Sequence, residues 1–422
     1  MREPASTMTT TTPGAPGSGP DTATASGGPL AGLRVLETGS LIAGPFCAQL
    51  LGDFGAEVIK LEDPGAGDPM REWGHRHPSG HSLSWPVIAR NKKSVTCNLR
   101  RREGQEILRG LAEHADVLVE NFRPGTMERW GCGYADLSRV NPGLIMTRVT
   151  GYGQTGPYAG RAGFGAIGEA MGGIRYLTGE PGRPTSRIGV SLGDSLAGTF
   201  AALGTVMAVV NRQRTGVGQV VDSAIYEAVL ALMEASLPEW ELAGFQRERS
   251  GSTLPGVAPS NVYPSRDGAE VLIAGNRDTV FRRLAEALGR TDWLDDERFA
   301  THTARGAHGA ELDGQIAAIT ATRDSEELLD ALHEAGVPAG LAYRSEDMLR
   351  DPHFAARQAI VRLTHPALGP FPMQNVVPRL SGTPGRVAAL GPELGEHTDE
   401  VLSAVLGTAP ERLHELRAQG IV

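Results

Sequence analysis

The chain has 422 residues, of which 40% are hydrophobic and 21% charged, an ordinary balance for a globular protein with two or three folding units. Its formal net charge of −9 argues against a nucleic-acid partner but allows an anionic small ligand held by a local basic patch. The three cysteines, Cys47, Cys97 and Cys132, fit neither a disulfide framework nor a zinc cluster. We therefore expect a reducing, cytoplasmic setting.

Two segments bear on targeting and membranes. Residues 1–28 are mostly Thr, Pro, Gly, Ala and Ser and lack the apolar run of a signal peptide, which predicts a disordered tail. Beyond them, the longest uncharged stretch is 195–211, shorter than a typical membrane span. It predicts a buried helix, and we expect no membrane partner.

Residues 33–150 alternate short β-rich runs with helical patterns. Strands are expected at 33–37, 57–62, 94–99, 116–121 and 144–150, and helices at 46–54 and 104–114. This alternation predicts an α/β fold with a doubly wound, mostly parallel (Rossmann-like) sheet. Such a sheet binds ligands beyond the carboxyl ends of its strands, at the point where the strand order reverses.

The pattern changes further along the chain. Asp194 opens a helix expected at 195–212, followed by a strand at 219–222 and a helix at 224–237. After a polar loop at 246–259, a strand at 270–274 and helices at 279–288, 312–320 and 326–335 indicate a smaller α+β unit. Two more helices are expected at 399–406 and 410–419.

Basic residues follow two of the predicted strands. Arg100–Arg102 come after the third strand, and Asn121–Arg123 after the fourth, with Arg129 soon after. Guanidinium groups pair well with phosphate, so these loops are candidates for a phosphorylated ligand. For Arg100–Arg102 a solvated surface run is an equally good interpretation.

Two other motifs are weak. Gly151–Gly156 has the spacing of a dinucleotide fingerprint, but it follows the fifth strand and Pro157 stands where a helix should begin. We interpret it as a loop. His75, His77 and His81 have no carboxylate or cysteine at ligand spacing, so we expect an exposed loop and no metal.

Two roles are possible for Asp194. At the start of an apolar helix it is either an N-cap, a common role for Asp, or a carboxylate kept ionised and nucleophilic by the helix end, with Gly193 allowing a substrate to approach. From the residues alone the cap is favoured.

Ordered motifs from about residue 30 to 406 resemble the class III CoA-transferases, the formyl-CoA transferase and CaiB/BaiF family. The motifs are Leu30-Ala-Gly-Leu-Arg-Val-Leu36, Ala43-Gly-Pro45, Leu51-Gly-Asp-Phe-Gly-Ala-Glu-Val-Ile-Lys-Leu-Glu62, Asn91-Lys-Lys-Ser94, Asp116-Val-Leu-Val-Glu-Asn-Phe-Arg-Pro-Gly125, Gly156-Pro-Tyr158, Gly193-Asp194, Arg214-Thr-Gly-Val-Gly-Gln219, Gly336-Val-Pro338 and Gly395-Glu-His-Thr398. So many ordered matches are specific to the family.

The resemblance assigns a role to each matched residue. Asp194 aligns with the catalytic aspartate, which forms an acyl mixed anhydride and then an aspartyl-CoA thioester. CoA esters are therefore the expected substrates, with small carboxylic acids as acceptors and no tightly bound cofactor. The CoA contacts that carry over are Ile42, Ala43, Cys97, Asn98, Leu99, Arg100, Asn121, Phe122, Arg123 and Arg129. Trp73 matches an aromatic residue that lines the acyl pocket in some members.

Departures from the family pattern narrow the substrate. Asp63 replaces a basic CoA contact, which makes Arg161 a candidate for the phosphate, and the segment 251–259 is shorter than the glycine-rich lid of the formyl-CoA enzyme. Formyl-CoA and oxalate are thus disfavoured. Residues 163–179 resemble the succinyl-CoA-dependent branch, which uses dicarboxylates such as malate or citramalate. The candidates for holding a distal carboxylate are Arg71, Arg175 and Arg187.

The resemblance also implies an interlocked homodimer. Residues 29–235 would form the first part of a large CoA-binding domain, 236–350 a small domain, and 351–422 a return segment completing the large one. The main rival function is the acyl-CoA racemase of the same superfamily. It is disfavoured because Gly163-Phe164-Gly165 lacks the His and Asp that would move the α-proton. A non-catalytic CoA-binding role is disfavoured by the intact Asp194.

Overall fold

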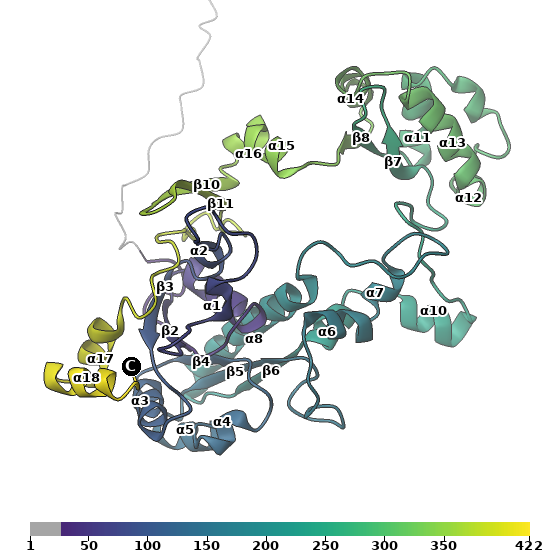
Figure 1. Cartoon of the computed structure of the whole chain (residues 1–422). Helices are drawn as coiled ribbons and strands as arrows, with labels where there is room; N and C mark the ends of the chain where they lie inside the picture. The colour runs from purple at the N-terminus through teal and green to yellow at the C-terminus, as the bar shows by residue number, and fades with distance from the viewer. Residues whose placement is uncertain (1–26) are drawn as a thin grey trace, which may run out of the picture.

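The computed structural model describes residues 27–422 in two bodies joined by extended segments (Figure 1). The larger body contains a parallel sheet and both ends of the described chain. The smaller body, green in Figure 1, stands apart from it. Residues 1–26 of the expected tail lie outside the described residues.

The larger body is built on a six-stranded sheet in the order β3-β2-β1-β4-β5-β6. All five pairings are parallel, so the predicted doubly wound α/β sheet is confirmed. The strand order reverses between β1 and β4. The strands are β1 Arg34–Glu37, β2 Glu57–Glu62, β3 Lys92–Thr96, β4 Val117–Glu120, β5 Ile145–Thr150 and β6 Val220–Ala224. The expected strand at 94–99 starts and ends earlier than predicted.

Successive side chains along each strand point to opposite faces of the sheet, and each face has its own hydrophobic core. On one face Val35 of β1 and Val119 of β4 pack with α1 (Ala43–Asp53) and α8 (Leu192–Thr215). On the other face Leu36 and Leu118 pack with α3 (Arg102–Glu113) and α5 (Tyr134–Val140). Because both faces are covered, the strands read as nearly continuous apolar runs in the sequence.

Helix α8 is long and apolar enough to span a membrane by length and composition. It packs instead along α1, so closely that a Cβ atom at Gly198 would lie 2.7 Å from the backbone oxygen of Ala43. One side of α8 therefore belongs to this core, but Phe200, Leu203, Met207 and Val210 are exposed, so the predicted burial holds for only part of the helix. The helix expected at 224–237 is divided into α9 (Ile225–Leu230) and α10 (Ser236–Ala243).

The smaller body has a core of its own. Three antiparallel strands, β7 (Ser260–Pro264), β8 (Glu270–Ala274) and β9 (Ala339–Leu341), pack against helices through Tyr263, Phe281 and other buried residues. The helices are α11 Asp278–Ala287, α12 His302–Ala307, α13 Gly309–Thr320 and α14 Ser325–Glu334.

The chain then returns to the larger body. It passes through α15 (Ser345–Arg350), α16 (Pro352–Ala356) and the hairpin β10–β11 (Ile360–His365 and Gly369–Gln374) to α17 (Thr398–Leu406) and α18 (Pro410–Ala418). Leu402 and Leu416 of the last two helices join the core that α3 covers. The backbone oxygen of Ile421 accepts a hydrogen bond of 2.7 Å from Asn98, directly after β3.

Candidate active site

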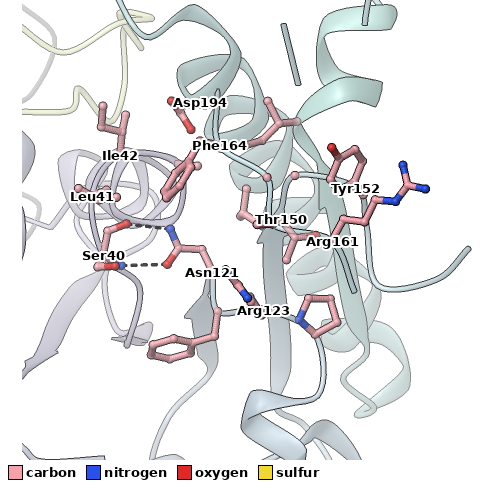
Figure 2. A pocket seen from close by; sticks show the side chains of 18 of the residues that line it. Ser40, Leu41, Ile42, Asn121, Arg123, Thr150, Tyr152, Arg161, Phe164 and Asp194 are labelled. Carbon is pink, nitrogen blue, oxygen red and sulfur yellow. Dashed lines mark hydrogen bonds between the residues drawn. The ribbon is translucent and has the colours of Figure 1, made fainter. Parts of the chain in front are cut away.

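The loops that follow β1 and β4 are fastened to each other where the strand order reverses. The side-chain amide of Asn121 accepts a hydrogen bond from the backbone nitrogen of Ser40 at 2.9 Å and donates one to its backbone oxygen at 2.8 Å (Figure 2). A Cβ atom at Gly39 would approach the Asn121 oxygen to 3.1 Å, so the amide lies flat against the loop. Asn121 is therefore a clamp between the two loops, and its amide makes both bonds within the protein.

A buried network of charged side chains also holds the loop that follows β1. Lys60 lies 2.6 Å from Glu37 and 2.7 Å from Asp68, and all three side chains are almost fully buried. Burial alone would lower the pKa of Lys60, but the charges of Glu37 and Asp68 raise it above its usual value. Asp68 also accepts a hydrogen bond of 3.1 Å from the backbone of Leu41, whose φ of 64° is unusual for a branched residue. The network thus holds the loop in one conformation.

Two adjoining pockets open at this end of the sheet. We call the first the Asp194 pocket; its volume is about 200 Å³. It is formed by the loops after β1, β4 and β5 and by the start of α8, and its lining includes Ser40, Ile42, Ala43, Asn121, Phe122, Arg123, Tyr152, Arg161, Phe164 and Asp194 (Figure 2). The second, the β2–β3 pocket, has about 390 Å³. Its lining includes Ser40, Asp63, Cys97, Leu99, Arg100, Phe122 and Trp130. Ser40 and Phe122 line both, so the pockets are neighbours.

Asp194 lies in the first turn of α8 rather than before it. The N-cap residue is Ser191 and Asp194 is the third helical residue, so the expectation that Asp194 caps the helix is wrong. Among residues 27–422, no group donates a hydrogen bond to the Asp194 carboxylate. Burial, and then the charge of Glu169, raise its pKa to about 6, while the charge of Arg187 lowers it. The carboxylate is therefore ionised at neutral pH, yet more basic than an exposed one.

The carboxylate fits because α6 (Gly165–Met171) has a glycine beneath it. A Cβ atom at Gly165 would lie 2.1 Å from Oδ2 of Asp194. On the same helix, a Cβ atom at Gly168 would lie 2.4 Å from the Ile225 side chain. The glycines let α6 approach α8 and α9 closely.

Glu169 of α6 joins this helix to the start of α8. Its Oε1 accepts a hydrogen bond of 3.2 Å from the backbone of Gly193, and its Oε2 one of 3.0 Å from Nε of Arg175. The side chain is buried. Glu169 is a site residue that was not predicted; the sequence signal for it is the spacing of glycines at 165, 168 and 172, which is typical of a closely packed helix.

Most of the expected CoA contacts lie in the two pockets. Those in the Asp194 pocket are Ile42, Ala43, Asn121, Phe122, Arg123 and Arg161. Those in the β2–β3 pocket are Cys97, Leu99, Arg100 and again Phe122. Asn98 and Arg129 line neither pocket: Asn98 binds the end of the chain, and Arg129 donates a hydrogen bond of 2.9 Å to Thr126.

The cations in the pockets have different partners. Arg161 stacks on the Tyr158 ring at 3.6 Å, and Arg100 pairs with Asp63 at 2.7 Å in an exposed position. Cys97, by contrast, is buried, and desolvation raises the pKa of its thiol to about 12, which makes it unreactive.

The residues expected to bind the acyl part separate into two groups. Arg71 binds both oxygens of Glu62 at 2.8 Å and stacks on Trp85 at 3.8 Å. The structure therefore does not bring Arg71 to either pocket. Trp73 is half exposed and lines a third cavity, which adjoins the Asp194 pocket at Ile42.

The histidine loop is held by a serine. Oγ of Ser79 lies 2.8 Å from Nδ1 of His77 and 3.0 Å from Nδ1 of His81. Within residues 27–422, no group of three His, Cys, Asp or Glu side chains is arranged to hold a metal ion.

Comparison with known proteins then decides the family. Residues 30–398 match the sequence model of CoA-transferase family III. The chain is a family III CoA-transferase. Its sequence is 57% identical over 394 residues to the succinyl-CoA–D-citramalate CoA-transferase of Chloroflexus aurantiacus, covering 93% of this chain and 98% of that protein.

Further relatives agree. This CoA-transferase is 41% identical to the beta subunit of the succinyl-CoA–L-malate CoA-transferase of the same organism, covering 93% of this chain and 98% of that subunit. A CaiB/BaiF family protein from Brucella suis superposes with a TM-score of 0.81 at 34% identity, covering 90% of this chain and 100% of the other. The resemblance to the CaiB/BaiF family that the sequence indicated is thus confirmed.

Proposed function

We propose that this CoA-transferase moves CoA from succinyl-CoA to a dicarboxylic acid of the citramalate type, with Asp194 as the covalent carrier. The observation that carries the proposal is the state of the Asp194 carboxylate. It lines a pocket at the ligand-binding edge of the sheet, and burial raises its pKa to about 6. The named relatives support the choice of donor and acceptor.

The first half of the reaction loads CoA onto the enzyme. An oxygen of Asp194 attacks the thioester carbon of succinyl-CoA, the carbon–sulfur bond breaks, and CoA leaves as the thiolate. The mixed anhydride joins the succinyl group to Asp194. The thiolate then attacks the aspartyl carbon, and succinate leaves with the bridging oxygen and its electron pair. The product is an aspartyl-CoA thioester.

The second half repeats these steps in reverse with the acceptor. The acceptor carboxylate attacks the aspartyl thioester, CoA thiolate leaves, and the thiolate attacks the acceptor carbon of the new anhydride. The new CoA ester departs and Asp194 regains its charge. Each half exchanges one carboxylate for another, so the reaction needs no net proton transfer, oxidant or metal-bound water.

The residues around Asp194 suit this chemistry. Its raised pKa makes the ionised carboxylate a stronger nucleophile than an ordinary Asp. Its position in the first turn of α8 favours negative charge through the helix dipole. Gly165 leaves the carboxylate room. For the phosphates of CoA we propose Arg123 and Arg161 in the Asp194 pocket and Arg100 in the β2–β3 pocket, with Asn98 and Arg129 as further predicted contacts.

We propose the homodimer on the basis of an apolar stripe. Phe200, Leu203, Met207 and Val210 recur along the exposed side of α8, each at least 40% exposed, as expected of a surface that a partner covers. The core of the smaller body runs from Tyr263 to Leu341, inside the small domain proposed at 236–350. Leu402 and Leu416 pack in the larger body, which supports 351–422 as the segment that completes the large domain. The three buried free cysteines support a cytoplasmic location. Light scattering of the purified protein tests the dimer.

A panel assay tests the function. The enzyme is incubated with succinyl-CoA and one carboxylic acid at a time, including D-citramalate, L-malate, glutarate, oxalate and butyrate, and the CoA esters are identified by mass spectrometry. We expect dicarboxylates of four or five backbone carbons to yield the new CoA ester in a one-to-one ratio with succinate. Succinyl-CoA that stays intact with every acid would contradict the proposal.

A further inference from the structure

A large groove opens on the other side of Ile42 from the Asp194 pocket. We call it the Arg187 groove; its volume is about 830 Å³. Its walls come from α1, from α2 (Trp85–Ile88), from Met70 and Trp73, and from residues 187–195. Ser195, which follows Asp194 in the chain, lines the groove. Asp194 itself lines only the Asp194 pocket, and the two cavities approach each other at Ile42, which lines both, and at Ser195.

The Arg187 groove carries one uncompensated charge. Of the described residues that line it, Asp53, Arg90 and Arg187 are charged. Arg90 donates to Asp53 at 2.6 and 2.9 Å and to the backbone oxygen of Gln374 at 2.6 Å. These two charges cancel. Arg187 forms no hydrogen bond or ion pair with any residue from 27 to 422, and it is exposed to the groove.

The other arginines expected near the acyl group are occupied. Arg71 is bound to Glu62 and Arg175 to Glu169. Arg187 alone among these three has its guanidinium available within the described part of the chain. Its charge also acts on Asp194, whose pKa it lowers, so the two groups lie within electrostatic reach of each other.

The backbone on either side of Arg187 is attached to the larger body. The backbone of Ser186 donates a hydrogen bond to Thr178 at 2.8 Å, and Ser191 is the N-cap residue of α8. The Arg187 guanidinium itself is free among the described residues, and a free guanidinium offers two parallel donors to a carboxylate.

We propose that Arg187 is a specificity-determining residue, which binds the distal carboxylate of the dicarboxylate substrate while the reacting carboxyl group lies at Asp194. The inference rests on the proposed function and adds the residue that distinguishes dicarboxylates from monocarboxylates. Trp73, Phe46 and Val87 provide an apolar wall for the carbon chain between the two carboxyl groups. CoA then extends from Asp194 into the Asp194 pocket, and the acid into the Arg187 groove.

The test compares donors with and without the distal charge. kcat/KM is measured for succinyl-CoA and for butyryl-CoA, which has the same chain length, in the wild type and in Arg187→Gln. We expect the succinyl-CoA value to fall about 10- to 100-fold, because a charge-assisted hydrogen bond is lost. The butyryl-CoA value should stay within about threefold on the same grounds, and Arg187→Lys should recover part of the preference.

Arg183→Gln is the matched control. Arg183 is an exposed arginine of the same segment and does not line the Arg187 groove, so its replacement should leave both values unchanged. If Arg187→Gln keeps the succinyl preference, or loses both donors equally, the inference is wrong while the proposed function stands. If the wild type transfers CoA from neither donor, the proposed function itself fails, and the inference fails with it.

Discussion

The carboxylate of Asp194 occupies the space that a side chain at position 165 would fill. The distance from Oδ2 to an added Cβ atom at Gly165 would be 2.1 Å, far inside van der Waals contact. Because Gly165 is buried in α6, a side chain added there would push the Asp194 carboxylate out of its position. The position of the nucleophile therefore depends on a glycine in another segment of the chain.

Gly165→Ala should displace the Asp194 carboxylate and lower kcat at least about 100-fold, as expected when a reacting group is misplaced by about 1 Å. Steady-state kinetics with succinyl-CoA measures the effect. Gly160→Ala is the control, since a Cβ atom there would meet no atom within 4 Å. Equal rates for the two variants would show that Asp194 tolerates the displacement.

The acid limb of the pH profile should report Asp194. Its pKa of about 6 means that kcat/KM falls as the pH drops through 6, because the protonated carboxyl group is a poor nucleophile. The profile is measured between pH 5 and 9 with succinyl-CoA. A profile that stays flat down to pH 5, as an ordinary Asp would give, would contradict the raised pKa.

Glu169→Gln removes the negative charge of the side chain and keeps its size. The amide can still accept a hydrogen bond from Gly193 or Arg175, but the charge that raises the pKa of Asp194 is removed. We expect the acid limb to move to lower pH, with the KM for succinyl-CoA little changed. If kcat falls and the limb stays near pH 6, Glu169 has only a structural role.

Asp194→Asn should stabilise the folded protein at neutral pH while abolishing transfer. The pKa of Asp194 is higher in the folded chain than its ordinary value of 3.8, so the folded state binds the proton more tightly. The free energy of unfolding therefore decreases as the pH rises from about 4 to 6, by up to about 3 kcal/mol. Asn does not ionise, so the free energy of unfolding of the variant does not decrease in this way.

Urea unfolding of wild type and Asp194→Asn at pH 7.5 and pH 4 measures the difference. We expect the variant to be more stable at pH 7.5 and the two proteins to converge at pH 4. A variant that is less stable at pH 7.5 would mean that the ionised carboxylate is well solvated or bonded.

Asn121→Ala should loosen the loop that follows β1. Losing both bonds to Ser40 should destabilise the protein by about 1–3 kcal/mol and raise the KM for succinyl-CoA. Asn141→Ala is the control: the Asn141 amide donates to the backbone oxygens of Ala112 and Ala115 and accepts from the backbone of Gly143, but Asn141 lines neither pocket. It should lose stability and keep its KM; a KM that rises equally in both variants would refute the clamp.

The sequence predicts the sheet because local pattern decides it. Strands β1, β2, β4 and β5 begin and end within one residue of expectation, since each is a short apolar run between a helix and a turn. The end of β3 was placed too late, at 99 instead of 96. The turn after it is held by Ile421, more than 300 residues away, and no local pattern reveals such a contact.

The residues of the site could be predicted from the sequence, but the ion pairs that they form could not. The basic loops and Asp194 were found because they follow strands or match family motifs. Arg71 is bound to Glu62, Arg175 to Glu169 and Arg90 to Asp53, which are 9, 6 and 37 residues apart. These pairings depend on how the chain turns back on itself in space, which no sequence pattern shows. Likewise, α8 begins at Leu192, where the Glu169 side chain accepts a hydrogen bond from the backbone of Gly193 in its first turn. A partner from another helix thus moved Asp194 from the cap into the first turn.

The most direct test of the account is to isolate the covalent intermediate. The enzyme is mixed with succinyl-CoA without acceptor, quenched in acid within one turnover, digested, and analysed by mass spectrometry with and without hydroxylamine. We expect a CoA adduct on the peptide that contains Asp194, removed by hydroxylamine and missing in Asp194→Asn. Transfer that proceeds with an unmodified Asp194 peptide, or an adduct on another residue, would contradict it.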